Sequence, residues 1–204
     1  MDPELKQLLD PKYSAVLVID IQNDACHPEG AYARRGRDIS LRQGAAHKAA
    51  EFIKAARRFN VPVIFTKAIH NQWVESPTWL KRHRRTQEPG YLEGTWGAEF
   101  YAVKPLNGEA IVVKHRYSAF FRTDLETILR SRGISTLLLT GGGTGACVES
   151  TARDGFMLDY DIIVVSDCCG TTTLKDHVLA LERMTRLCGT VLESNEILEQ
   201  WTPL

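Results

Sequence analysis

The chain has 204 residues, 44% of them apolar, a size that predicts one domain over residues 1–204 with a single sizeable core. Its 25 basic residues equal its 25 acidic ones, so no overall field attracts nucleic acid, and no apolar run approaches the roughly 20 residues that span a bilayer. Five cysteines in a chain of this length do not indicate a disulfide framework, so we expect a cytoplasmic protein. Its expected partners are a small molecule and other copies of the chain, as a dimer or tetramer.

Apolar runs alternate with helical patterns along most of the chain. Continuous apolar runs, typical of strands buried on both faces, lie at residues 15–19, 61–66, 110–113, 134–140, 162–165 and 190–192. Helical spacing predicts helices over residues 41–59, 123–133, 147–159 and 174–187, with short ones near 5–9 and 196–200. Residues 123–126 match a capping box, and residues 26–40 are expected to be a loop. This alternation predicts a three-layer α/β/α fold around a parallel, doubly wound, Rossmann-like sheet.

The connection over residues 67–109 differs in kind from the rest of the chain. It shows no clean period and holds the basic cluster 81–85 together with Trp73, Trp79 and Trp96. A connection this long inside a compact domain is usually a lid, a binding loop or an oligomer contact. We expect a lid or oligomer-contact region, whose tryptophans either wall a pocket or pack in the interior.

Three of the apolar runs lead into residues with reactive side chains, namely Asp20, Lys114 and Cys147. The carboxyl ends of parallel strands share one edge of a sheet, where ligands of open α/β sheets bind. We therefore expect an acid, a base and a thiol to meet there. Each residue alone has an ordinary explanation as a turn residue, a surface charge or a small buried side chain. The functional hypothesis depends on their coincidence.

These three residue types can perform nucleophilic catalysis on an amide. Cys147 follows a glycine-rich turn and is expected to open a helix, whose free N–H groups favour a thiolate and can bind a developing oxyanion. Asp20 can accept the thiol proton, pass it to the leaving nitrogen and later activate water. Lys114 can stabilise the anions that form.

A rival hypothesis belongs to a different class of protein. Gly141, Gly143 and Ala146 follow a strand and open a helix with the spacing of a dinucleotide fingerprint, and Asp167 stands where the ribose-binding acid is expected. Against this, the unit contains the fourth predicted strand instead of the first. It also leaves Cys147 without a role.

Three segments resemble the isochorismatase-like cysteine hydrolase family: residues 16–24 (VLVIDIQND), 113–125 (VKHRYSAFFRTDL) and 140–153 (TGGGTGACVESTAR). The resemblance extends from about residue 13 to 195 and implies a six-stranded parallel sheet with strand order 3-2-1-4-5-6. It implies a catalytic triad of Asp20, Lys114 and Cys147. It also implies a cis peptide at Gly142–Gly143 and an oxyanion hole made by the N–H groups of Gly143 and Cys147.

The resemblance also indicates the reaction. Family members that retain the cysteine cleave C–N bonds, and segments 30–38 and 116–121 are most similar to the ureidoacrylate and carbamoyl-amide hydrolases. This implies a cysteine amidohydrolase that acts on a small amide or ureide. Nicotinamidase-type and maleamate-type amidases of the same family are the alternatives. Nicotinamidase-like members carry an Asp/His metal cluster, but here only His70 and His83 lie in that region, without an Asp-x-His pattern. We therefore expect no metal and no cofactor.

Five residues are candidates for substrate contacts: Gln22, Asn23, Trp73, Arg116 and Tyr117. One geometric question stays open. With strand order 3-2-1-4-5-6, the strand of Lys114 lies two strands from that of Asp20, a gap of roughly 10 Å at about 4.8 Å per strand. Either the lysine leans across or its strand is displaced.

Overall fold

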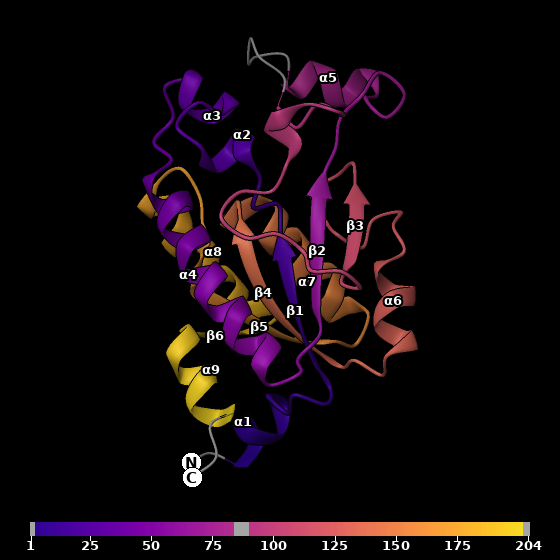
Figure 1. Cartoon of the computed structure of the whole chain (residues 1–204), viewed down its shortest axis with the longest axis vertical. Helices are drawn as coiled ribbons and strands as arrows, with labels where there is room; N and C mark the ends of the chain where they lie inside the picture. Colours follow the sequence, from indigo (N-terminus) through magenta and orange to yellow (C-terminus); the bar gives the residue numbers. More distant parts are fainter. Residues whose placement is uncertain (1–2, 84–89, 202–204) are drawn as a thin grey trace.

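The computed structural model describes residues 3–83 and 90–201, with a six-stranded sheet at its centre (Figure 1). All neighbouring strands are parallel and their order is β3-β2-β1-β4-β5-β6, which confirms the predicted sheet. The strands are β1 (Ser14–Ile19), β2 (Val63–Ala68), β3 (Ala110–Lys114), β4 (Thr136–Gly142), β5 (Asp161–Gly170) and β6 (Thr190–Leu192).

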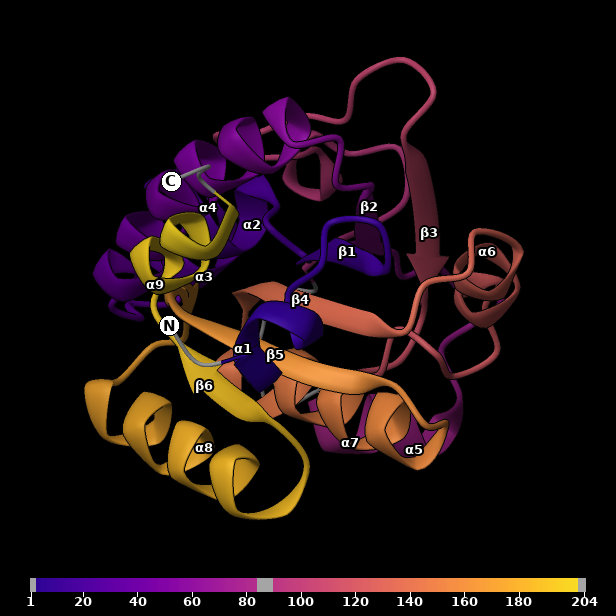
Figure 2. The same cartoon turned by 90° about the horizontal axis from the view of Figure 1, so that it is seen from below.

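Helices cover both faces of the sheet because its inner strands are apolar on both. In β1, Val16 and Val18 join one core cluster, whereas Leu17 and Ile19 join the other. Helices α4 and α9 pack on the first cluster and α6, α7 and α8 on the second, so that α4 and α8 lie on opposite sides of the sheet (Figure 2). The helices in the described ranges are α1 (Pro3–Leu8), α2 (Asn23–Cys26), α3 (Ala31–Arg34), α4 (Ser40–Arg58), α5 (Pro77–His83), α6 (Leu125–Ser131), α7 (Glu149–Met157), α8 (Leu174–Leu187) and α9 (Ser194–Trp201).

Two local predictions are wrong. The expected loop at 26–40 contains α3, and α2 ends at its start. The expected capping box is absent: α6 has Asp124 at its N-cap without a side-chain capping bond, and Glu126 pairs with Arg130 one turn later. Thr123 Oγ1 accepts the Leu125 N–H and donates to the carbonyl of Ala119. The threonine therefore closes a turn ahead of α6.

The segment after β4 also departs from expectation. The chain enters a π-helical turn over Thr144–Val148 before α7 begins, so Cys147 lies inside this turn. Gly141 makes the turn possible, because its φ is +106° and a Cβ there would lie 2.0 Å from the Ile19 carbonyl oxygen.

The connection between β2 and β3 passes over the carboxyl ends of the strands. It contains α5 and a short 3₁₀ turn at Trp96–Ala98, and Figure 1 shows α5 above β2 and β3, with α2 and α3 on the other side of the same edge. The basic cluster 81–85 falls partly outside the described residues. Within the described ranges, no helix is long and apolar enough to cross a membrane.

Candidate active site

The structure brings Asp20 and Lys114 into direct contact at the carboxyl edge of the sheet. Lys114 Nζ lies 2.6 Å from Asp20 Oδ2, and the two side chains are only 1% and 2% exposed. Thr66 on β2 donates a hydrogen bond of 2.7 Å to Asp20 Oδ1. Lys114 Nζ also donates to the carbonyls of Arg116 and Tyr117, at 2.9 and 3.1 Å. The carboxylate and the ammonium are therefore buried and held from several directions.

The structure answers the question of how Lys114 reaches Asp20. β3 is paired with β2, with Lys114 beside Ala68, so β3 keeps its place in the sheet. The lysine side chain itself spans the gap, since its Nζ lies 2.6 Å from Asp20 Oδ2 although β2 stands between β3 and β1. Burial lowers the pKa of Lys114, but the nearby Asp20 carboxylate and Cys147 sulfur raise it, and the net shift is upward. Lys114 is therefore a cation at neutral pH.

Cys147 completes the cluster, but its protonation state differs from the expected thiolate. Burial is the largest influence and raises the pKa of the thiol, Lys114 lowers it, and a charge effect and hydrogen bond from Asp20 raise it again. The pKa reaches about 11. Cys147 is thus a thiol at neutral pH. Attack on a substrate requires that its proton leave during the reaction.

A cavity of about 460 Å³ opens onto this cluster. Six of the predicted catalytic, oxyanion-hole and substrate-contact residues line it: Asp20, Lys114, Arg116, Tyr117, Gly143 and Cys147. The peptide bond between Gly142 and Gly143 is cis, as the resemblance implied. Trp79 forms part of the wall, and the Arg116 guanidinium lies 4.9 Å from the centre of its ring.

Four other candidates do not line the cavity. Gln22 is fully buried, and its amide binds the backbone of Ala68 and Ala98. Asn23 donates to the Trp96 carbonyl at 2.9 Å. Both side chains therefore anchor the long connection instead of facing the cavity.

Two tryptophans of the long connection also lie away from the cavity. Trp73 is 87% exposed, and Trp96 packs edge-on against His27. The positions of the three tryptophans in the sequence did not reveal which of them faces the cavity.

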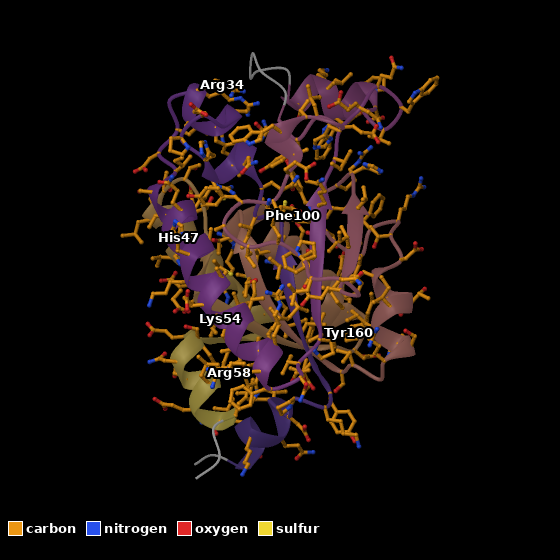
Figure 3. All side chains as sticks on the ribbon, in the orientation of Figure 1. Arg34, His47, Lys54, Arg58, Phe100 and Tyr160 are labelled. Carbon is orange, nitrogen blue, oxygen red and sulfur yellow. The ribbon has the colours of Figure 1, made fainter. Side chains whose placement is uncertain are left out.

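Sequence reasoning missed several wall residues: Tyr32, Arg35, Arg42, His70, Glu75 and Tyr91. A signal for Arg42 existed, because it lies one helical turn before Ala45 and Ala46 on the buried face of α4. Other polar residues of α4, such as His47 and Lys54, lie on its exposed face (Figure 3). A charged residue on an apolar stripe indicates either a buried partner or a site.

The dinucleotide alternative loses its main support. Asp167 does not end its strand, because β5 continues to Gly170. Its carboxylate accepts bonds of 2.9 Å from the Ser194 N–H and 2.6 Å from the Ser194 hydroxyl, at the start of α9. It is therefore occupied in holding a helix. Gly142 and Gly143 face the cavity that contains Cys147.

The predicted absence of a metal stays a prediction. Among the described residues, no three His, Cys, Asp or Glu side chains are grouped closely enough to hold an ion. His70 Nδ1 lies 3.9 Å from Glu75 Oε1, and the side chain of His83 falls outside the described residues.

A parallel sheet of this strand order, flanked by helices, is the fold of the isochorismatase-like α/β hydrolases. The family model described as isochorismatase domain matches residues 14–196, so the chain belongs to this family. The ureidoacrylate amidohydrolase RutB of Methylobacterium radiotolerans is 37% identical over 174 residues, which are 78% of this chain and 67% of that protein.

Two solved structures extend the comparison. An isochorismatase family protein from Desulfovibrio vulgaris has a TM-score of 0.80 and 28% identity, covering 92% of this chain and 97% of that one. The N-carbamoylsarcosine amidase from Thermoplasma acidophilum has a TM-score of 0.74 and 27% identity, covering 89% and 96%. The chain is thus a hydrolytic enzyme of the amidohydrolase type, which acts on C–N bonds.

Proposed function

We propose that the chain hydrolyses the C–N bond of a small amide or ureide through a thioester on Cys147. Asp20 acts as the general acid and base, and Lys114 provides electrostatic support. The observation that carries this proposal is the position of Asp20, which pairs with the Lys114 ammonium at 2.6 Å and lines the same cavity as the Cys147 thiol. No other described carboxylate is placed to serve both groups.

The first half of the reaction forms the thioester. The Cys147 sulfur attacks the amide carbonyl carbon while its proton moves to Asp20, which is needed because the resting group is a thiol. The N–H groups of Gly143 and Cys147 hold the oxyanion. Loss of one such donor typically costs about 10²–10³ in turnover. Asp20 then gives its proton to the departing nitrogen, the C–N bond breaks, and an amine or ammonia leaves.

The second half returns the enzyme to its starting state. Water attacks the thioester carbonyl and passes a proton to Asp20. The C–S bond breaks, the acid product leaves, and the proton returns to the sulfur. Throughout, the Lys114 cation stabilises the Asp20 carboxylate at 2.6 Å, so that the acid can release its proton after each transfer.

The support for a ureide as substrate comes from the relatives, one named a ureidoacrylate amidohydrolase and another an N-carbamoylsarcosine amidase. A cavity of about 460 Å³ is of the size that takes a small molecule. We also propose that residues 67–109 act as a lid or an oligomer contact of one domain, since Trp79 and Tyr91 from this connection stand at the cavity wall.

The experiment is a screen for ammonia release over ureidoacrylate-type, N-carbamoyl, nicotinamide and maleamate substrates, followed by intact-mass analysis of the enzyme during turnover. We expect an acyl adduct in the wild type and none in Cys147→Ala. Cys188→Ala is the matched control, because Cys188 is buried elsewhere and does not line the cavity. Undiminished ammonia release by Cys147→Ala would refute the proposal. If activity is found only on nicotinamide or maleamate, that compound and not a ureide is the substrate.

A further inference from the structure

Arg42 is a buried cation that the proposed reaction does not use. It lies in the first turn of α4, is 7% exposed, and lines the same cavity as Cys147. Its Nε has no hydrogen-bond partner, and within residues 3–83 and 90–201 no carboxylate pairs with it. Burying a charge without a counter-charge is costly. Such a group therefore calls for an explanation.

The guanidinium is held in a slot made of weakly polar surfaces. A Cβ added at Gly142 or Gly143 would lie 2.7 Å from one of its terminal nitrogens, so the space that a side chain would fill there is taken by Arg42. The Tyr32 ring centre lies 4.9 Å from the Arg42 Cζ. The two glycines therefore make room for a flat cation next to the turn that leads to Cys147.

The groups that face Arg42 do not neutralise it. They are the side chains of Tyr32, Tyr91, Cys26 and Cys147, and burial raises the pKa of Tyr91 and of both cysteines. Tyr91, Cys26 and Cys147 are thus neutral at neutral pH. Within the described part of the chain, no anion compensates the positive charge of Arg42.

The charged residues of the whole wall give the same result. Four cations (Arg35, Arg42, Lys114, Arg116) and two anions (Asp20, Glu75) line the cavity, which leaves an excess of two positive charges. Lys114 is paired with Asp20, and Arg116 donates to two backbone carbonyls. Among the described residues, Arg35 and Arg42 each keep an Nε without a hydrogen-bond partner, and Arg42 is the more deeply buried of the two.

We propose that Arg42 binds a carboxylate of the substrate, so that the enzyme selects amides or ureides that carry such a group. This inference rests on the proposed function, since it concerns the same cavity. A guanidinium presents donors in a planar fork that matches a carboxylate, and such charge-assisted bonds are strong. The substrate carboxylate lies beside the Gly142–Gly143 turn while its amide carbonyl meets Cys147.

The test uses two alkylating reagents that share one reacting carbon. Iodoacetate carries a carboxylate and iodoacetamide a neutral amide, and mass spectrometry follows the rate at which each modifies Cys147. We expect Arg42→Gln to lower the iodoacetate rate about 10- to 100-fold relative to the iodoacetamide rate. Arg42→Lys should retain part of the preference. An equal change in both rates, which a purely structural role would produce, would overturn the inference.

A matched control and a measurement on the unaltered enzyme keep the test decisive. Arg37→Gln removes a cation 5.0 Å from the same Tyr32 ring but outside the cavity, and should leave the rate ratio unchanged. In the wild type, propionate should slow alkylation by iodoacetamide, whereas propionamide at the same concentration should not. Equal protection by both would contradict the inference even if the Arg42 variants do not fold.

Alkylation does not require turnover, so the two proposals can fail separately. If the enzyme reacts preferentially with iodoacetate but hydrolyses no amide, the carboxylate site at Arg42 is supported and the proposed hydrolase function is refuted. Where a ureide is hydrolysed, Arg42→Gln should lower kcat/KM about 10- to 100-fold for the carboxylate form and little for its carboxamide counterpart. Equal loss on both would overturn the role of Arg42 while the hydrolase remains.

Discussion

The ion pair between Lys114 and Asp20 gives the sharpest prediction about this protein. Replacing Lys114 with Met removes the ammonium 2.6 Å from a carboxylate that is 2% exposed. Breaking a buried pair by removing one partner costs about 3–5 kcal/mol, because the other charge is left uncompensated. For roughly 200 residues, an unfolding entropy of about 2.1 cal/mol/K per residue turns this into a Tm lower by about 7–12 °C.

The assays are thermal unfolding and ammonia release, with two further variants for comparison. Asp20→Asn combined with Lys114→Met removes both charges and should recover much of the lost stability while activity stays absent. Lys67→Met is the surface control, because its pair with Glu99 is 2.9 Å long but partly exposed, and it should cost less than about 1 kcal/mol. Unchanged stability of Lys114→Met, or a double variant no more stable than the single one, would refute this reasoning.

Three further predictions concern the same cavity. Thr66→Val removes the 2.7 Å bond to Asp20 Oδ1 and should lower kcat/KM by about 10-fold or more, whereas Thr66→Ser should retain activity. Because the pKa of Cys147 is raised to about 11, its alkylation by iodoacetamide should keep accelerating as pH rises above 9. A plateau below pH 9 would contradict that prediction. Trp79 forms part of the cavity wall, so Trp79→Ala should raise KM. Trp73 is 87% exposed, so Trp73→Ala should change neither KM nor stability. The reverse pattern would show that the wall residues are wrongly assigned.

The sheet could be predicted because its signal is local. The run at residues 15–19 is apolar throughout, since β1 is buried on both faces between two other strands. The rule that parallel strands end at one edge then placed Asp20, Lys114 and Cys147 together. Both arguments use only the order of residues and the chirality of the chain.

The finer features of the site depend on contacts between distant segments. Lys114 reaches Asp20 across β2, from a position beside Ala68 that the register of β3 against β2 sets. The Cys147 thiol is not ionised, since burial outweighs the neighbouring ammonium. Neither register nor burial can be deduced from the residues adjacent to a position.

Taken alone, the amino-acid sequence determined the class of fold, the strand order through its resemblance to a family, and which three reactive residues share an edge. Only the tertiary structure decided that Gln22 anchors the long connection and that Trp79 instead of Trp73 faces the cavity. It also decided that Arg42 lies beside Gly143 with no partner for its Nε among the described residues. The physical reason is the distance along the sequence over which the responsible contacts act. Periodicity records whether a residue faces solvent or core, whereas the charge and hydrogen bonding of a site are set by side chains that meet only after the layers have packed.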